Sequence, residues 1–163
     1  MSEAKKNNSE NSELLQLVSF KIATEEFGVD ILDVQEIIKI VQITKVPNSP
    51  PFVEGVINLR GKVIPVIDLR TRLGLNKIEH DKDTRIIVVE LSKSTIGFIV
   101  DAVNEVLRIP VSITEAPPEI VSGIDSEFIK AVGKLDDRLL ILIDLNQILH
   151  QDETKQLEKM NKE

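Results

Sequence analysis

The sequence predicts a mainly β protein made of two small β-barrels, and three observations support this fold class. Ile and Val account for 22 and 17 of the 163 residues, and β-branched aliphatic residues favour strands. The chain contains only seven Gly and seven Pro, so most of it should be ordered. Short strands separated by turns recur along the chain, which is typical of small barrels.

A comparison of the chain with itself reveals an internal repeat. Shifted by 69 residues, residues 34–40 align with residues 103–109, and every position is identical or conservatively replaced. Shifted by 76 residues, residues 52–56 align with residues 128–132. The two shifts differ by seven, which implies a seven-residue insertion in the second copy, near residues 116–123.

This repeat indicates a duplication that produced two similar β units, residues 16–75 and residues 85–150. The alternative is a single sandwich whose strands are pseudo-symmetric. A unit of this size buries too little apolar surface to be robust alone, so we expect the two units to share a third apolar layer. Candidates for this layer are Ile31, Val34, Val100 and Val103.

The first unit begins with two strands. Residues 17–23 alternate apolar and polar side chains, which predicts a half-buried strand. After a turn at residues 24–25, Phe27 and Val29 lie on one face of a second strand. A helical turn over residues 31–38 follows, with Asp30 as its N-cap. An extended segment then runs to Val46, and a short turn ends at Gly55.

The segment from residue 53 to residue 70 predicts a hairpin, because two β-branched runs flank Arg60-Gly61-Lys62. Asn58 and Arg60 are the polar residues among these strand formers. Burying an unpaired guanidinium is very unfavourable, so both side chains should face solvent or have specific partners. Asp68 then caps a short helix that stops at Gly74.

The second unit repeats this plan. We expect strands at residues 85–91 and 95–101, an extended segment at residues 102–109, and a hairpin that turns at Asp136-Asp137. Asp144, with Gln147 three residues later, forms a capping-box start for a C-terminal helix.

The composition excludes several classes of function. There is no Cys, so no disulfide or Cys metal site exists. The net charge of −7 and the lack of Trp and Tyr argue against nucleic-acid binding. Residues 1–13 are polar and lack an apolar signal region, so we expect a flexible tail there, and we expect residues 151–163 to be a polar extension. No apolar run reaches the ~20 residues that span a bilayer, so we expect a cytoplasmic protein without membrane insertion.

The sequence offers few candidates for catalysis. His80 and His150 have no neighbours with metal-ligand spacing, and no phosphate-binding loop or nucleophile elbow is present. Asp30, Asp68 and Asp144 each precede a short helix, where capping explains them. We therefore predict no catalytic residue, no cofactor and no metal. A small-barrel ligand binder and a carboxylate-based hydrolase remain as alternatives.

One charged pair stands out. Glu36 follows an apolar stripe, and Arg60 is the obvious cation within the same unit. Because a guanidinium can hold a carboxylate bidentately, we hypothesise an ion pair that fixes the hairpin; the alternative is two separate solvated charges. The repeats differ most at residues 58–61, which align with residues 134–137, so the first hairpin should have its own partner.

Several blocks together resemble the CheW family of bacterial chemotaxis coupling proteins. The likeness covers about residues 15–150, within a domain expected to span residues 14–150. The blocks that carry it are residues 27–31, 34–37, 52–61, 65–70, 97–101 and 137–144. The resemblance implies two five-stranded SH3-like barrels and a non-enzymatic adaptor. It implies that this adaptor joins the regulatory domain of the histidine kinase CheA to the cytoplasmic tips of chemoreceptors, with weak self-association in arrays.

The resemblance also implies which residues bind partners or control the conformation that binds them. The positions that match the family pattern are Val34, Glu36, Gly55, Asn58, Arg60 and Val106. Exposed apolar and edge-strand surface would accept a receptor helix or another barrel, and the charges would set register more than affinity.

Overall fold

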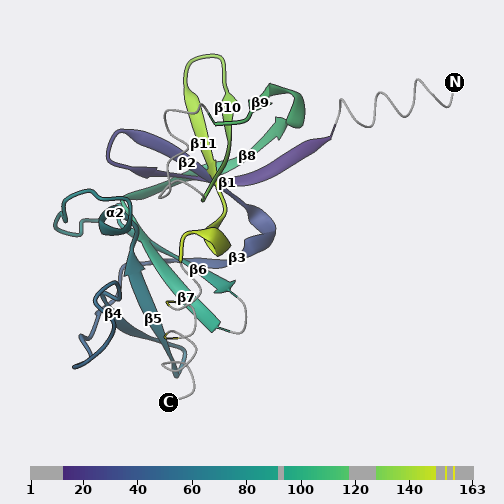
Figure 1. The fold of residues 1–163 in the computed structure, drawn as a ribbon. Coiled ribbons are helices and arrows are strands. Elements are labelled where there is room, and N and C mark those ends of the chain that lie inside the picture. Colours follow the sequence, from purple (N-terminus) through teal and green to yellow (C-terminus); the bar gives the residue numbers. More distant parts are fainter. Residues whose placement is uncertain (1–12, 92–93, 118–127, 150–152, 154–155, 157–163) are drawn as a thin grey trace, which may run out of the picture.

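The computed structural model describes residues 13–91, 94–117 and 128–149, together with Glu153 and Gln156. These residues form two sheets that lie one above the other (Figure 1), which confirms the mainly β prediction. The predicted tail, the insertion near residues 116–123, His150 and the C-terminal extension lie wholly or largely outside the described residues.

The two sheets have the strand orders β8-β1-β2-β11-β10-β9 and β3-β6-β7-β5-β4. The six-stranded sheet contains β1 (Leu14–Ile22), β2 (Glu25–Asp30), β8 (Ala102–Pro110), β9 (Thr114–Glu115), β10 (Ile129–Lys134) and β11 (Leu139–Ile143). The five-stranded sheet contains β3 (Val34–Lys39), β4 (Gly55–Leu59), β5 (Lys62–Asp68), β6 (Arg85–Leu91) and β7 (Ser94–Val100). The short helices are η1 (Ile31–Asp33), α2 (Leu69–Arg72), η2 (Val111–Ile113) and η5 (Leu145–Gln147).

The two repeats exchange their first hairpins. The hairpin β1–β2 of the first repeat joins β8, β10 and β11 of the second, whereas β6–β7 joins β3, β4 and β5. The 69- and 76-residue shifts convert one strand order into the other, and the parallel pair Val66–Gly97 corresponds to Leu142–Gly28. The strand order and register of the two sheets thus follow the repeat seen in the sequence.

One sheet differs from the expected five strands because β9 adds a sixth. Its residues Thr114 and Glu115 pair with β10. The corresponding position in the other sheet is an isolated bridge between Thr44 and Val56. The sixth strand is therefore a longer version of a contact that both sheets make.

Three apolar clusters hold the molecule together. The largest lies between the sheets and includes Phe20 of β1 and Phe98 of β7, both fully buried. It is the predicted shared layer: Val100 is buried in it, and Ile31, Val34 and Val103 pack against it. Each sheet also has its own cluster, one around Ile57 and Val88 and the other around Leu17 and Leu140. Burial of apolar surface on both faces stabilises each small sheet.

The helical turn predicted for residues 31–38 is much shorter. Asp30 is its N-cap, with Oδ1 accepting the Leu32 N–H at 2.9 Å, but the helix ends at Asp33. From Val34 onward the chain is strand β3, paired with β6. Residues 31–38 fit a helical periodicity, but β6 supplies the backbone hydrogen bonds, and this tertiary pairing overrides the local pattern.

The other short helices agree better with the sequence. Asp68 Oδ1 accepts the Arg70 N–H at 3.0 Å and begins α2, and Gly74 has φ +83° just beyond it. Asp144 caps η5 through the Asn146 N–H at 2.9 Å, although η5 is a single 3-10 turn. Of the rest of the predicted C-terminal helix, the described residues Glu153 and Gln156 are helical.

Within the described part of the chain, no helix is long and apolar enough to cross a membrane. The same residues contain no cluster of three or more His, Asp or Glu side chains that could hold a metal ion.

Candidate partner-binding site

The turn between β4 and β5 is a two-residue hairpin loop. Leu59 pairs with Lys62, and the two residues between them, Arg60 and Gly61, have φ values of 53° and 86°. Positive φ at both central positions defines a type I′ turn, where Gly61 is expected and Arg60 is not. A side chain that accepts this unfavourable backbone region points to a function for Arg60.

Asn58 supports this turn rather than projecting freely from it. Its Oδ1 accepts the Gly61 N–H at 2.8 Å, which is the local side-chain-to-backbone bond that Asn favours in turns. Asn58 thus fixes the backbone geometry that presents Arg60 to solvent.

Arg60 and Glu36 form the hypothesised ion pair. Arg60 Nη1 donates to Glu36 Oε1 at 2.9 Å, and Nη2 donates to Oε2, so the contact is bidentate. The Arg60 side chain is 70% exposed, whereas that of Glu36 is 28% exposed. The hydrogen bond from Arg60 lowers the pKa of Glu36, and the same bond raises the pKa of Arg60. The pair joins the edge strand β3 to the β4–β5 hairpin.

Gly55 lies at the other end of β4 and allows a close backbone approach. A Cβ atom at this position would lie 2.6 Å from both Ile43 Cγ2 and Thr44 O. Next to it, Thr44 and Val56 exchange two backbone hydrogen bonds of 2.9 and 2.8 Å. Gly55 therefore lets the segment after β3 lie directly against β4, at the end of the strand opposite the turn.

The two valines have different environments. Val34 is half-buried at the start of β3 and packs against the shared apolar layer. Val106 lies on β8, in the other sheet, and is 54% exposed. Its repeat counterpart on β3 is Ile37, which is 37% exposed. The structure thus gathers Glu36, Asn58 and Arg60 at one turn and leaves Val106 on a separate surface.

A second ionic cluster escaped the sequence analysis. Arg138 Nε donates to Glu26 Oε1 at 2.8 Å, and its Nη2 lies 3.8 Å from an oxygen of Glu105, the repeat counterpart of Glu36. Ser19 Oγ also donates to Glu26, at 2.6 Å. Hydrogen bonds to Glu26 and then Asp137 raise the pKa of Arg138.

The repeat alignment could have revealed this cluster. It placed Glu105 opposite Glu36, but Asp136 occupies the turn position that corresponds to Arg60. The cation is two residues further on, where Arg138 corresponds to Lys62, whose Nζ donates to Thr95 Oγ1 at 3.0 Å. In both sheets, a cation at this position therefore ties the hairpin to a neighbouring strand. Lys62 contacts Thr95 of β7, and Arg138 contacts Glu26 of β2.

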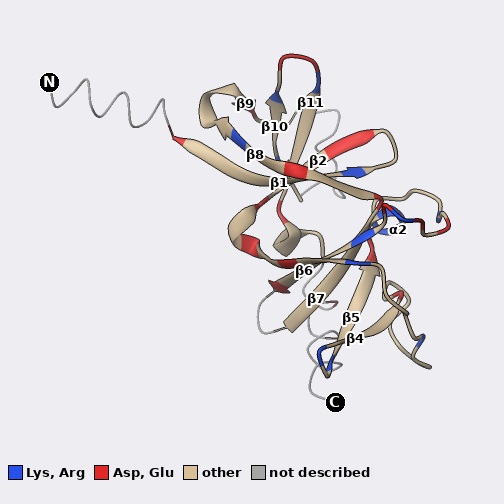
Figure 2. Cartoon of the chain, turned by 180° about the vertical axis from the view of Figure 1, so that it is seen from behind, with Lys and Arg blue, Asp and Glu red and all other residues tan. Residues whose placement is uncertain are grey.

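The two turns differ in charge. Figure 2 shows basic residues at the β4–β5 turn and acidic residues at the β10–β11 turn, which lie at opposite ends of the molecule. The residues concerned are Arg60 and Lys62 in the first turn and Asp136 and Asp137 in the second. An exposed apolar side chain follows each turn, Val63 at 58% and Leu139 at 59% exposure.

The profile of the CheW-like domain matches residues 16–153. The chemotaxis protein CheW of Klebsiella aerogenes is 36% identical over 138 residues, which cover 85% of this chain and 83% of that protein. CheW of Helicobacter pylori is 38% identical over 143 residues, covering 88% of this chain and 86% of that protein.

A solved structure gives the same result. The scaffolding protein TtCheW from Thermoanaerobacter tengcongensis superposes with a TM-score of 0.77 at 45% sequence identity, covering 86% of this chain and 96% of that one. The paired sheets and the extent of the sequence match agree, and we conclude that this chain belongs to the CheW-like family.

Proposed function

We propose that this protein is a non-enzymatic adaptor that couples the cytoplasmic tips of chemoreceptors to the histidine kinase CheA. The observation that carries the proposal is the match to CheW proteins over most of both chains, including a scaffolding protein at 45% identity. In this role the protein is recruited from the cytoplasm to membrane-bound receptor arrays, where it also associates weakly with itself.

The surface around the β4–β5 turn is our candidate for contact with the regulatory domain of the kinase. It combines the Arg60–Glu36 pair with the exposed side chain of Val63. Apolar contact provides affinity there, whereas the charges select register and partner. Asn58 and Gly55 act on this surface through the turn and through β4. Val34 and Val106 lie outside it and are candidates for the receptor side.

Weak contacts of this kind suffice in an array. When an adaptor binds two partners that are themselves clustered, each second contact forms at a high effective concentration. The geometry that allows both partners to bind at once then matters more than the affinity of either contact alone.

Calorimetry with the isolated CheA regulatory domain tests the proposal. We expect wild-type protein to bind with micromolar or tighter affinity and Arg60→Ala to bind more weakly. Lys77→Ala is the matched control, because Lys77 forms an exposed ion pair with Glu54 at 2.8 Å away from the turn. Circular dichroism verifies that each variant is folded.

The outcomes are distinct. No binding by folded wild-type protein would reject the coupling function and favour a ligand-binding barrel. If wild-type protein binds and Arg60→Ala binds equally well, Arg60 would instead belong to the receptor-binding surface or have an internal structural role. A similar loss in both variants would show that the effect is not specific to the turn.

A further inference from the structure

We propose that Arg70 and Asp101 form a latch that fixes the relative orientation of the two sheets and thereby positions the two partner surfaces. The second half of this proposal rests on the proposed function. The sheets are joined by the shared apolar layer, and apolar packing is non-directional. Interdigitated side chains restrict the angle between two packed sheets, and directional contacts restrict it further; charge-assisted hydrogen bonds are the strongest of these.

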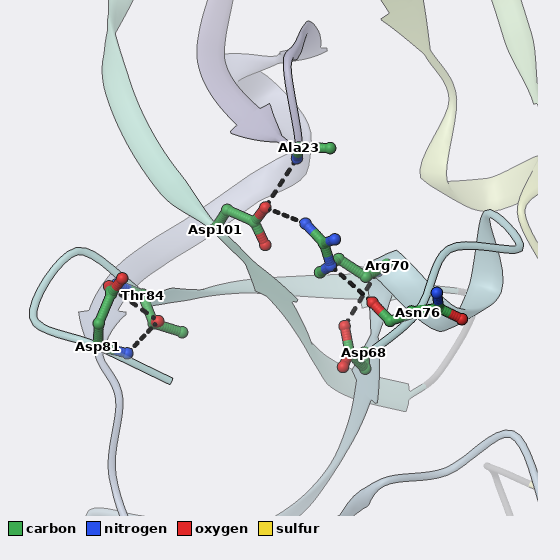
Figure 3. A network of polar contacts seen from close by, with 7 residues as sticks. All are labelled: Ala23, Asp68, Arg70, Asn76, Asp81, Thr84 and Asp101. Atoms are coloured by element: carbon green, nitrogen blue, oxygen red, sulfur yellow. Dashed lines mark hydrogen bonds and ion pairs between the residues drawn. The ribbon is translucent and has the colours of Figure 1, made fainter. Parts of the chain in front are cut away.

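Asp101 occupies the point where the chain passes from one sheet to the other, between β7 and β8. Its Oδ2 accepts the Ala23 N–H at 2.7 Å from the β1–β2 turn of the six-stranded sheet. The same oxygen accepts Arg70 Nη1 at 2.5 Å from α2, which follows β5 of the five-stranded sheet. Figure 3 shows both bonds converging on this one carboxylate.

Each member of the latch is itself held in place. Arg70 Nε donates to Asn76 O at 2.9 Å, so the guanidinium is oriented by two bonds. The Asp101 N–H donates to Lys21 O at 3.1 Å. Ala23 has φ 55°, a region that favours Gly, and this backbone aims its N–H at Asp101.

The latch is also shielded from solvent. The side chains of Arg70 and Asp101 are 13% and 19% exposed, compared with 70% for Arg60 in the site pair. Water and salt screen partly buried charges less than exposed ones. The contact therefore persists under conditions that weaken the surface pairs.

The repeat shows that this latch is one-sided. The counterpart of Asp101 is Leu32, and the counterpart of Arg70 is Asn146; these two side chains cannot form an ion pair. Leu32 lies in η1, at the other crossing between the sheets, and is 88% exposed. Duplication would give both crossings the same contacts, but only one of them has this charged pair.

Another hydrogen bond between the two sheets would remain if the latch were lost. Arg72, also on α2, donates through Nε to Ile148 O at 3.0 Å, beyond β11 of the six-stranded sheet. Because this bond and the apolar layer remain in an Arg70 variant, we expect the sheets to reorient rather than separate.

Residual dipolar couplings of backbone amides in the full-length protein test the latch. In wild-type protein the couplings of β1–β2 and β6–β7 should fit a single alignment tensor with the orientation seen here. In Arg70→Gln and Asp101→Asn each hairpin should still fit well, but the two hairpins should require differently oriented tensors. Asp101→Asn is the milder change, since Asn keeps an acceptor for Ala23, and it decides the matter if Arg70→Gln unfolds.

Lys134→Gln is the matched control. It removes an ion pair to Glu115 at 2.7 Å that lies within a single sheet, so the single tensor should persist. A single tensor with wild-type orientation in the folded latch variants would overturn the proposal, even if their thermal stability fell.

The positioning role is tested separately with the kinase regulatory domain and a receptor cytoplasmic fragment, each alone and the two joined by a flexible linker. In the latch variants each partner alone should bind as in wild type, while affinity for the linked pair should fall about tenfold, since simultaneous engagement of joined partners depends on geometry. An unchanged affinity for the linked pair would reject the positioning role. If wild-type protein binds neither partner, the proposed function and the positioning role both fail, whereas the dipolar couplings still decide the latch.

Discussion

At the scale of a single residue, two opposing effects act on the stability of the turn at Arg60. Its positive φ is unfavourable for a residue with a Cβ atom, whereas its bidentate contact with Glu36 favours the folded hairpin. The contact is largely exposed, so its contribution to the free energy of unfolding should be small. Stability alone therefore does not account for Arg at this position.

Substitutions at Arg60 can separate the two effects. Arg60→Ala loses the ion pair and keeps the backbone strain, so we expect it to lower the free energy of unfolding. Arg60→Gly loses the pair and relieves the strain, so it should be more stable than Arg60→Ala. Urea denaturation measures both. If Arg60→Ala were as stable as Arg60→Gly or more stable, the turn would not impose positive φ on residue 60 in solution.

Asp68 is a capping residue whose charge is unfavourable. Its side chain is buried, with a relative exposure of 4%, and this burial raises its pKa, an effect that the hydrogen bond from the Arg70 N–H partly offsets. The folded state therefore binds a proton more readily than the unfolded state. At pH values near and just above the usual Asp pKa, this group makes stability rise as the pH falls.

Asp68→Asn should consequently be more stable than wild type at pH 7, because Asn retains the cap without a buried charge. The gain should shrink toward pH 4, as the wild-type carboxyl becomes protonated. Asp68→Ala should lose about 1 kcal/mol through the missing cap. Thermal unfolding from pH 4 to pH 7 measures these differences. A gain that does not depend on pH would exclude the buried charge as its cause.

At the scale of elements, β4 shows how a glycine controls strand packing. Gly55 allows residues 43–44 to lie directly against the strand, and the bridge between Thr44 and Val56 depends on that approach. In the second repeat the counterpart of Gly55 is Ala131, where β9 and β10 pair instead. Both repeats thus pair this strand with a preceding segment, through one bridge beside Gly55 in the first repeat and through β9 in the second.

Gly55→Ala should destabilise the protein by about 1–3 kcal/mol, the usual range for overpacking, because the added methyl group meets the Thr44 carbonyl at 2.6 Å. Gly133→Ala should have a smaller effect, since its nearest neighbour is the flexible end of Ile109 at 3.3 Å. Chemical denaturation of both variants tests this order. A smaller loss for Gly55→Ala would indicate that the 43–44 segment moves away easily.

At the scale of the whole molecule, the exchanged hairpins make the two sheets interdependent. The five-stranded sheet needs β6 and β7 from the second repeat, and the six-stranded sheet needs β1 and β2 from the first. The main apolar cluster also draws on both repeats. Cooperative unfolding of the whole described region follows from this topology.

We therefore expect separate fragments of residues 13–75 and 85–149 to be unfolded, because each leaves β-strands without partners and apolar surface exposed. Circular dichroism and thermal melts of each fragment measure this, with the intact chain as the folded reference. Mixing the fragments should restore β structure if assembly is reversible. A cooperative melt of either fragment alone would show that the repeats are independent folding units.

The sequence by itself determined the features that depend on neighbours along the chain. Alternating side chains, the Arg60-Gly61 turn and the caps at Asp30, Asp68 and Asp144 involve contacts within a few residues, so local patterns were sufficient to predict them. The Glu36–Arg60 pair was also accessible, because both members belong to the same repeat and Arg60 is the obvious cation there. Comparison of the repeats extended this to the shared apolar layer.

Only the tertiary structure decided which strands pair with which. Residues after Asp33 fit a helical period, but pairing with β6 made them a strand. The exchange of hairpins, the Arg138 cluster and the Arg70–Asp101 latch all join residues far apart in the sequence. Each hairpin has similar apolar faces and open edges, so local chemistry leaves the choice of partner open; burial of the complete set of strands around one shared layer selects it.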